Sequence, residues 1–247
     1  YKRQILLSSD VADVRMKMFN IDGSEGEMCG NGIRCFVRFA SDIGAIVFSD
    51  QAVHVETAAG IISVTPIYND GEMTHASVSM GAPKLTPSVI PMDIKLNGPV
   101  IDFDLDLGIE KIPVTAISMG NPHAVTFIDD DIDNYPLHEI GPLIERHSLF
   151  PKRVNFEIVN ILARDRLKVR VWERGSGLTQ ACGTGACAVV VAANLKGLVD
   201  ENVTIDLPGG LLKIKWPGRG SVVMEGPVAT VFNGEWFDQA TNITATT

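Results

Sequence analysis

The chain repeats its own pattern, and this duplication limits the possible folds more than any other feature of the sequence. Four pairs of segments match in the same order: 14–19 with 167–172, 28–32 with 181–185, 53–62 with 203–212, and 77–83 with 221–227. The first pair alternates apolar and basic side chains, as half-buried β-strands do. The second pair contains a Cys-Gly turn, and its two cysteines, Cys29 and Cys182, are 153 positions apart. The matches predict two similar structural units.

A helix is expected after each Cys-Gly turn. After the first turn, apolar side chains recur at helical spacing at Cys35, Phe36, Phe39, Ala40 and Ile43. After the second turn, residues 186–195 are apolar on nearly every side, which is typical of a helix buried all round. Gly44 and Gly197 are placed to end the two helices.

These elements predict an α+β fold of two pseudo-symmetric units, each a mostly antiparallel, barrel-like sheet around a central buried helix. The expected N-terminal unit comprises residues 1–83 with the first Cys-Gly turn, and a C-terminal strand at 229–247 joins it. Residues 84–228 form the expected C-terminal unit with the second turn. Because duplicated units commonly pack with two-fold symmetry, we expect Cys29 to face Cys182 between the units, where small-molecule sites often form.

The charge balance argues against polyanionic partners. Lys and Arg number 21 against 30 Asp and Glu, which gives a net charge of −9, and the basic residues form no run. Binding to nucleic acid or to an anionic membrane is therefore not expected. The longest apolar stretch, 181–195, is interrupted by glycines and falls short of the roughly 20 residues of a membrane span. Four cysteines do not make a disulfide framework, so we expect free thiols in a reducing, cytoplasmic compartment.

The Cys-Gly turns are the expected reactive elements. Each thiol lies where a helix begins, so the helix dipole favours the thiolate. The glycines are expected to adopt positive-φ conformations, and the free amides of the first turn can hold an anion such as a carboxylate. Cys35 and Cys187 lie six and five residues further along, turned away from the first thiols, and are expected to be buried structural cysteines. Because the thiols of each pair diverge, no metal site is expected.

Two facing thiols beside a carboxylate-binding turn suggest proton transfer at a tetrahedral carbon. Inversion of such a carbon needs a base on one face and an acid on the other. A pair of equivalent groups suits a reaction whose two directions are near mirror images, as in a racemase or epimerase acting at the α-carbon of an amino acid. The sequence has no nucleotide or pyridoxal fingerprint, so we expect a reaction without a cofactor.

Longer motifs around both turns resemble a known family. Residues 19–35 (FNIDGSEGEMCGNGIRC) and 172–185 (WERGSGLTQACGTG) resemble the two signatures of diaminopimelate epimerases. Residues 118–125 (SMGNPHAV) and 150–155 (FPKRVN) resemble two further blocks of that family, in the family's order. The resemblance implies the epimerisation of LL-2,6-diaminopimelate to the meso form, in lysine and peptidoglycan precursor biosynthesis, by two-base proton transfer at one α-carbon.

The resemblance also implies roles for individual residues. Cys29 and Cys182 are the implied acid–base pair, and His123 and Glu173 support and polarise the thiols. The residues implied to read the two amino-acid ends of the substrate are Asn20, Asn121, Asn155, Glu173 and Arg174. The backbone amides implied to hold the reacting carboxylate are those of Gly30, Asn31, Gly183 and Thr184. On the residues alone, His123 is interpreted as a loop histidine bonded to the backbone, and Glu173 with Arg174 could equally form a solvated ion pair.

Three other functions remain open. Proline and hydroxyproline racemases share both Cys-Gly motifs, although they usually carry His where this chain has Asn31, and Asp in place of the Glu173–Arg174 pair. A thiol redox protein could form a Cys29–Cys182 disulfide, and a binding module could hold an amino acid without catalysis. The chain has no match to the Gly-Asn-Asp-Phe segment near the start of the family, so one implied substrate-binding Asn has no counterpart. A small molecule is the expected partner, and a homodimer is one assembly open to the chain.

Overall fold

The duplicated segments form the same elements in the same order in both halves of the chain. The computed structural model describes residues 3–20, 23–26, 28–47 and 49–235. The first half comprises β1 (Arg3–Leu7), β2 (Val14–Phe19), β3 (Glu25–Gly26), α1 (Gly30–Asp42), β4 (Val53–Thr57), β5 (Gly60–Asn69) and β6 (Glu72–Ser79). The matching elements of the second half are β10 (Asn155–Ala163), β11 (Arg166–Glu173), β12 (Gly177–Thr179), α3 (Gly183–Leu195), β13 (Asn202–Leu207), β14 (Gly210–Lys215) and β15 (Val223–Pro227). Between the two sets lie β7 (Val100–Asp106), β8 (Lys111–Ser118), β9 (Pro122–Phe127) and α2 (Leu137–Glu145).

The strand pairing of the first half is repeated in the second. β2 pairs with β4 in parallel, so that Arg15 faces Glu56. β11 pairs with β13 in parallel, so that Lys168, which follows Arg15 by 153 positions, faces Asp206. A short strand just before each Cys-Gly turn, β3 or β12, pairs antiparallel with β2 or β11. The structure therefore has the duplication that the sequence predicts.

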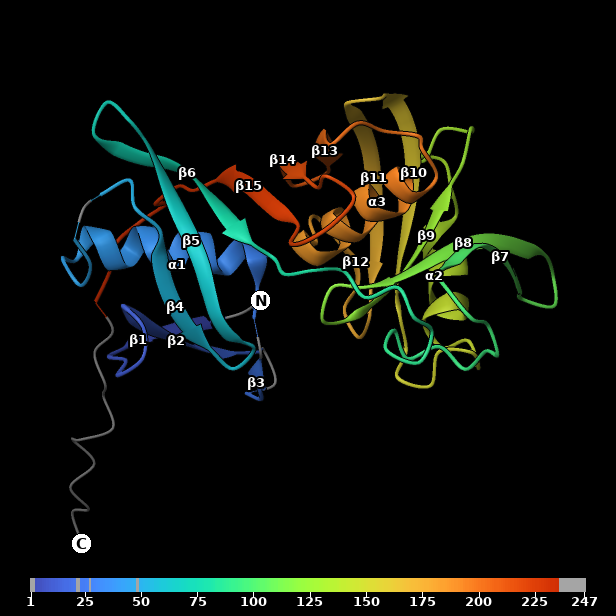
Figure 1. Ribbon diagram of the computed structural model, residues 1–247, viewed down its shortest axis with the longest axis horizontal. Coiled ribbons are helices and arrows are strands. Elements are labelled where there is room, and N and C mark those ends of the chain that lie inside the picture. The colour runs from blue at the N-terminus through green and yellow to red at the C-terminus, as the bar shows by residue number, and fades with distance from the viewer. Residues whose placement is uncertain (1–2, 21–22, 27, 48, 236–247) are drawn as a thin grey trace, which may run out of the picture.

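The two halves join where β6 pairs antiparallel with β15, and we call this line the seam (Figure 1). Ser79 of β6 faces Val223 of β15, which is its own counterpart in the match of 77–83 with 221–227. A two-fold axis between antiparallel strands passes where a residue faces its equivalent. The pseudo-two-fold axis therefore crosses the seam at Ser79 and Val223, and it relates α1 to α3.

One continuous sheet of fifteen strands runs through the described residues of both halves. Its main path is β1-β2-β4-β5-β6-β15-β14-β13-β11-β10-β9-β8-β7, with β3 attached to β2 and β12 attached to β11. Most neighbouring strands are antiparallel, and the sheet curls past α1 in one lobe and around α3 in the other (Figure 1). The predicted class, an α+β fold with mostly antiparallel sheet around a helix in each unit, is confirmed.

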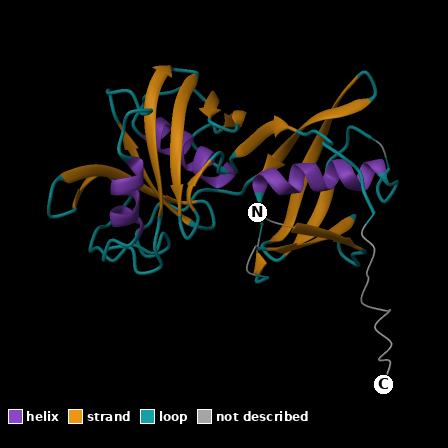
Figure 2. Ribbon diagram, turned by 180° about the vertical axis from the view of Figure 1, so that it is seen from behind, coloured by secondary structure: helices purple, strands orange, loops and turns teal. Residues whose placement is uncertain are grey.

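The two helices differ in how completely strands cover them. α3 contacts β8, β9, β10, β14 and β15, and residues 185–193 are all buried. α1 contacts β1, β5, β6 and β15. Seen from behind, strands pass in front of α3, whereas α1 lies in front of the strands of its own lobe (Figure 2). The predicted burial is therefore right for the second helix and right for only one face of the first.

The outer face of α1 corrects the expectations for its apolar side chains. Phe36 and Ala40 are buried, but Phe39 is 50% exposed and Ile43 is 56% exposed. Cys35 is exposed, whereas the prediction made it a buried structural cysteine. Six residues beyond Cys29, Cys35 faces the side of α1 that no described strand covers.

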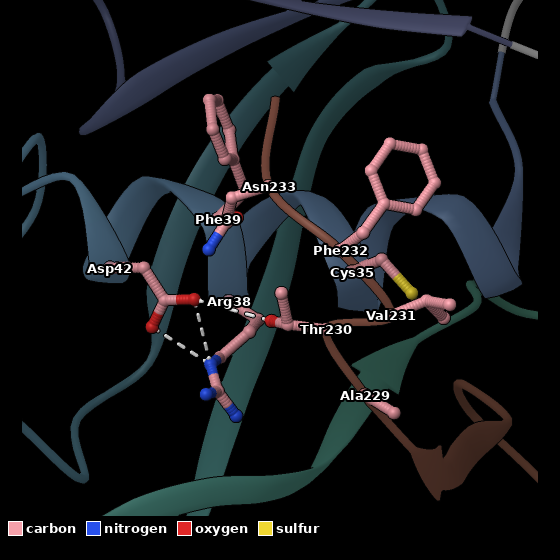
Figure 3. Close-up of a pocket in the computed structure, with 9 residues that line it drawn as sticks. All are labelled: Cys35, Arg38, Phe39, Asp42, Ala229, Thr230, Val231, Phe232 and Asn233. Atoms are coloured by element: carbon pink, nitrogen blue, oxygen red, sulfur yellow. Dashed lines mark hydrogen bonds and ion pairs between the residues drawn. The ribbon is translucent and has the colours of Figure 1, made fainter. Parts of the chain in front are cut away.

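Residues 229–233 lie against this outer face (Figure 3). They enclose a cavity of about 230 Å³ together with α1 side chains that include Cys35, Arg38 and Phe39. The expected strand at 229–247 is wrong for residues 229–235, which form no strand, and residues 236–247 lie outside the described part of the chain. Residues 229–233 run along a helix, whose interior backbone groups are already bonded, so no strand ladder can form there.

Among the described residues, no helix is both long and apolar enough to cross a membrane.

Candidate active site at the two Cys-Gly turns

Each cysteine of the predicted pair is the N-cap of its helix. Cys29 precedes α1 and Cys182 precedes α3, both with an extended backbone. Sγ of Cys29 accepts a hydrogen bond from the amide of Gly32 at 3.4 Å, and Sγ of Cys182 accepts one from the amide of Gly185 at 3.4 Å. Each sulfur therefore lies at the positive end of a helix dipole, where a thiolate is stabilised.

The glycines of the turns serve close packing, which corrects the expectation of positive φ values. The glycines of the two first helical turns all have negative φ: Gly30, Gly32, Gly183 and Gly185. A methyl group on Gly30 would lie 2.7 Å from Cε of Met224, and one on Gly185 would lie 2.7 Å from Oε1 of Glu157. Side chains from distant strands thus reach the backbone of both turns because these positions carry no side chain.

The two helix starts lie close to each other at the seam. A methyl group on Gly183 would lie 3.6 Å from Oδ1 of Asn31. Nη1 of Arg34 donates to that same oxygen at 3.2 Å and to the carbonyl of Gly30 at 3.2 Å. Arg34 is itself buried, so it holds the Asn31 amide in place at the start of α3. The structure therefore brings together residues from both halves that were predicted to hold the carboxylate.

Cys182 lies in a buried and acidic environment. The residue is 7% exposed, and its sulfur lies 3.5 Å from the hydroxyl oxygen of Thr184. Burial raises the pKa of the Cys182 thiol, and the carboxylates of Glu173 and Glu157 raise it further. The Thr184 hydroxyl and the Gly185 amide lower it by smaller amounts. The protonated thiol is therefore the favoured form of Cys182.

His123 lies between two oxygens next to this turn. Its Nδ1 is 2.7 Å from Oε1 of Glu157, and its Nε2 is 3.0 Å from Oδ1 of Asn121. His123 on β9 and Glu157 on β10 are 0% exposed, and the two strands pair in parallel. Burial raises the pKa of the Glu157 carboxyl, the contact with His123 opposes that rise, and Glu173 adds to it. His123 and Glu157 thus form a buried acid–base pair beside Cys182.

Comparisons with known proteins give the family. The sequence model of the family described as diaminopimelate epimerase matches residues 4–86 and 115–231. A diaminopimelate epimerase from Bacillus cereus is 46% identical over 232 residues, which cover 93% of this chain and 80% of that protein. A diaminopimelate epimerase from Bacillus anthracis is 45% identical over the same shares of the two chains. The chain belongs to the diaminopimelate epimerase family.

Solved structures of other proteins share this fold. A probable proline racemase from Agrobacterium radiobacter has a TM-score of 0.68 and 16% identity, covering 92% of this chain and 73% of that chain. A phenazine biosynthesis protein of the PhzF family from Bacillus anthracis has a TM-score of 0.62 and 17% identity, covering 92% of this chain and 83% of that chain. At these identities the likeness concerns the fold alone.

The remaining residues implied by the epimerase family have different hydrogen-bond partners. Glu173 is half-buried, accepts a hydrogen bond from the Thr179 hydroxyl at 2.5 Å and acts on Cys182 through its charge. Asn20 donates to Oγ of Ser24 at 3.0 Å within its own turn. The Asn20 side chain also lies close to Gly26 of β3, three residues before Cys29.

Asn155 and Arg174 are joined to each other rather than to a thiol. Nδ2 of Asn155 donates to the carbonyl of Pro122 at 2.8 Å, and its Oδ1 accepts from the amide of Arg174 at 2.9 Å. The buried Asn155 side chain thus fixes the backbone next to His123 and at Arg174. The exposed Arg174 guanidinium donates to the carbonyl of Lys152 at 3.0 Å.

Sequence reasoning missed two side chains that pack on the turns. Glu157 reaches Gly185, and the amide of Gln4 on β1 reaches Gly32, so that a methyl group on either glycine would overlap them. The spacing of the duplication could have found both, because Gln4 and Glu157 are 153 positions apart, as are Cys29 and Cys182. Both residues lie before the first pair of matching segments, 14–19 and 167–172.

Proposed function

We propose that the chain interconverts LL- and meso-2,6-diaminopimelate by moving a proton between two thiols and one α-carbon. The observation that carries the proposal is that Cys29 and Cys182 are N-caps of helices related by a pseudo-two-fold axis, with their helix starts in contact at the seam. Inversion of a carbon needs such a pair, one group for each face. Membership of the diaminopimelate epimerase family supports this reaction.

The proposed steps conserve protons. The thiolate of one cysteine removes the α-proton from one face and becomes a thiol. The carbanion delocalises into the substrate carboxylate, which the amides at the starts of α1 and α3 stabilise through hydrogen bonds and the two helix dipoles. The thiol of the other cysteine then donates its proton to the opposite face and becomes a thiolate. The reverse reaction uses the same groups in exchanged roles.

The choice of diaminopimelate as substrate rests on the end of the substrate that does not react as well as on the reacting α-carbon. Diaminopimelate carries a second amino-acid end, and the residues proposed to read it are Asn20, Asn121, Asn155, Glu173 and Arg174. The Arg174 guanidinium has donors left for a carboxylate beyond its bond to Lys152. A substrate that lacked this end would lose the hydrogen bonds and ion pairs to these side chains, which are worth about 0.5–1.5 kcal/mol for a neutral contact and about 1.5–3 kcal/mol for a charged one.

Solvent-deuterium exchange tests the proposal. The protein is incubated in D2O with LL-diaminopimelate, L-lysine or L-proline, and α-deuterium and new stereoisomers are followed by NMR. We expect deuterium and the meso isomer from diaminopimelate and slow exchange for the other two amino acids. Cys35→Ala, which removes the exposed thiol of α1, is the matched control for Cys29→Ala.

A proline or hydroxyproline racemase is the second candidate, because a probable proline racemase and a hydroxyproline epimerase are among the structures that share the fold. Faster exchange with L-proline than with diaminopimelate would favour it and would contradict the proposed substrate.

A further inference from the structure

One pair of equivalent side chains differs in charge between the two halves. Gln4 of β1 faces Met18 of β2, and Glu157 of β10 faces Val171 of β11. Met18 and Val171 are 153 positions apart, so the strand register makes Gln4 and Glu157 counterparts. Each packs on the third residue after a thiol, Gln4 on Gly32 and Glu157 on Gly185. The equivalent position therefore carries a neutral amide near Cys29 and a carboxyl group near Cys182.

The carboxyl group of Glu157 is close to the thiol and poorly compensated. A methyl group on Gly185 would lie 2.7 Å from Oε1 of Glu157 and 3.3 Å from Sγ of Cys182, so both atoms border one small space. Oε1 is paired with Nδ1 of His123, while the buried Oε2 has no hydrogen-bond partner among the described residues. A carboxylate in such a place acts strongly on its neighbours, because little solvent screens it.

We propose that Glu157 is a positioning residue that keeps Cys182 protonated in the resting enzyme and orients the His123 ring, leaving the resting thiolate to Cys29. This inference rests on the proposed function for its catalytic meaning, since a two-thiol site works when one sulfur is a thiolate and the other a thiol. The effect of Glu157 on the ionisation of Cys182 can be measured without substrate.

The groups that face Cys182 come from four elements. β10 supplies Glu157, β11 supplies Glu173, and β9 supplies His123 behind Glu157. α3 supplies the Gly185 amide and the Thr184 hydroxyl, which favour the thiolate only weakly against burial and two carboxylates. Near Cys29, by contrast, the described side chains include the neutral Gln4 and the buried Arg34 guanidinium. The difference in charge between the two turns thus arises at two equivalent positions, where Glu173 replaces Asn20 and Glu157 replaces Gln4, and of the two carboxylates Glu173 acts more strongly on Cys182.

The test measures each thiol separately. Because only the thiolate reacts, the rate of iodoacetamide labelling against pH reports ionisation of each cysteine, with peptide mass spectrometry to resolve Cys29 from Cys182. In Glu157→Gln, which keeps the size of the side chain, we expect the Cys182 midpoint to fall by at least one pH unit. At a fixed lower pH this is about a tenfold faster labelling of Cys182. The Cys29 profile serves as internal reference and should not move.

Two further variants separate charge from shape. Gln4→Glu places the same charge on the other turn and should raise the Cys29 midpoint while leaving that of Cys182 unchanged. Glu157→Asp keeps the charge but shortens the reach to His123, so it should lower kcat with little change in the Cys182 midpoint. Glu145→Gln removes another buried carboxyl group, one that bonds Trp172 and Gly175, and should change neither midpoint.

The outcomes are distinguishable. An unchanged Cys182 midpoint in Glu157→Gln would overturn the inference, as would a Gln4→Glu variant in which the Cys29 midpoint stays in place. If Glu157→Gln does not fold, Gln4→Glu still decides. In the active enzyme, Glu157→Gln should also move the alkaline limb of the kcat/KM profile to lower pH, because a second thiolate forms earlier. Absence of epimerisation together with the expected labelling shifts would refute the proposed function and leave the role of Glu157 intact.

Discussion

The two helices that begin at the Cys-Gly turns share a sequence pattern, an N-cap and a strand register, yet one is enclosed and the other is open. β8, β9 and β10 cover α3, and its interior-facing and outward-facing residues are equally buried. α1 has β1 where α3 has β10, and its outer face exposes Phe39 and Ile43 (Figure 2). The turn geometry is nevertheless the same, with 3.4 Å from sulfur to amide in both. The local sequence therefore determines the geometry of the turn, and the surrounding strands determine how far its helix is shielded from solvent.

The largest expected effect concerns the feature that both halves share. Cys29→Ala and Cys182→Ala should each lower kcat by roughly a thousandfold or more, since each removes the group proposed as acid or base for one face. The difference in enclosure should not appear in this measurement. Epimerisation of diaminopimelate is followed by circular dichroism or NMR, with Cys35→Ala as control. Turnover near that of the unmodified protein in either alanine variant would mean that the two halves do not contribute equally to the reaction.

A matched pair of substitutions sharpens the contrast in enclosure. Phe39 and Ala192 are 153 positions apart, but Phe39 is 50% exposed and Ala192 is 0% exposed. Ala192→Gln must fit a larger polar group into a closed core and should lower the free energy of unfolding by about 3 kcal/mol or more. Phe39→Gln places the same side chain on the open face and should cost less than about 1 kcal/mol. Urea unfolding of the two variants gives both values, and equal costs would show that α1 is covered in solution.

The residues proposed to read the distal end of the substrate come mostly from the enclosed half, with Asn20 from the open half. Arg174→Met removes a charge-assisted contact, which is worth about 1.5–3 kcal/mol, so we expect kcat/KM to fall about 10–100-fold. Asn20→Ala removes a neutral contact and should cost about tenfold or less. Steady-state kinetics with diaminopimelate measures both, and L-lysine should stay a poor substrate throughout. A larger effect of Asn20→Ala would reverse the assignment of the main specificity determinants to the second half.

The smallest effect separates the two remaining thiols, Cys187 in the enclosed half and Cys35 in the open half. Burial raises the pKa of Cys187 above its value in the unfolded chain, which is about 8.5. The buried thiol therefore contributes its full stabilisation below that pH, and the free energy of unfolding falls as the pH rises above it. Cys182, whose thiol pKa is also raised by burial, contributes in the same way. Cys187→Ala should reduce the loss of stability per pH unit above pH 9 by about half, whatever its cost at neutral pH. Cys35→Ala should leave that slope unchanged, and an equal response would show that the two thiols have similar environments.

The sequence predicts what is local or repeated, and it fails where strands distant in the chain meet. The buried α3 follows from its uniformly apolar residues, and both turns follow from their motif. Phe39 and Cys35 carried the same apolar signal as buried residues, but their exposure depends on which strands cover α1. The motif does not reveal why Gly185 is a glycine, because the side chain that approaches it, Glu157, comes from β10, a strand outside the motif. Gln4 and Glu157 could have been found by extending the 153-residue spacing to the start of the chain, since only the duplication relates them.

The seam also bears on the order in which the chain folds. The hairpins β4-β5-β6 and β13-β14-β15 pair residues that are near neighbours in sequence, whereas Ser79 and Val223 are 144 positions apart. Closing so long a loop costs chain entropy that no local contact offsets, and pairings of this kind form slowly. During refolding the two lobes can thus acquire their strands while their thiols are still unrelated in space. Epimerase activity should return in a late phase of refolding, after most of the circular dichroism signal. The two Cys-Gly turns are brought together only when the two separately formed halves dock.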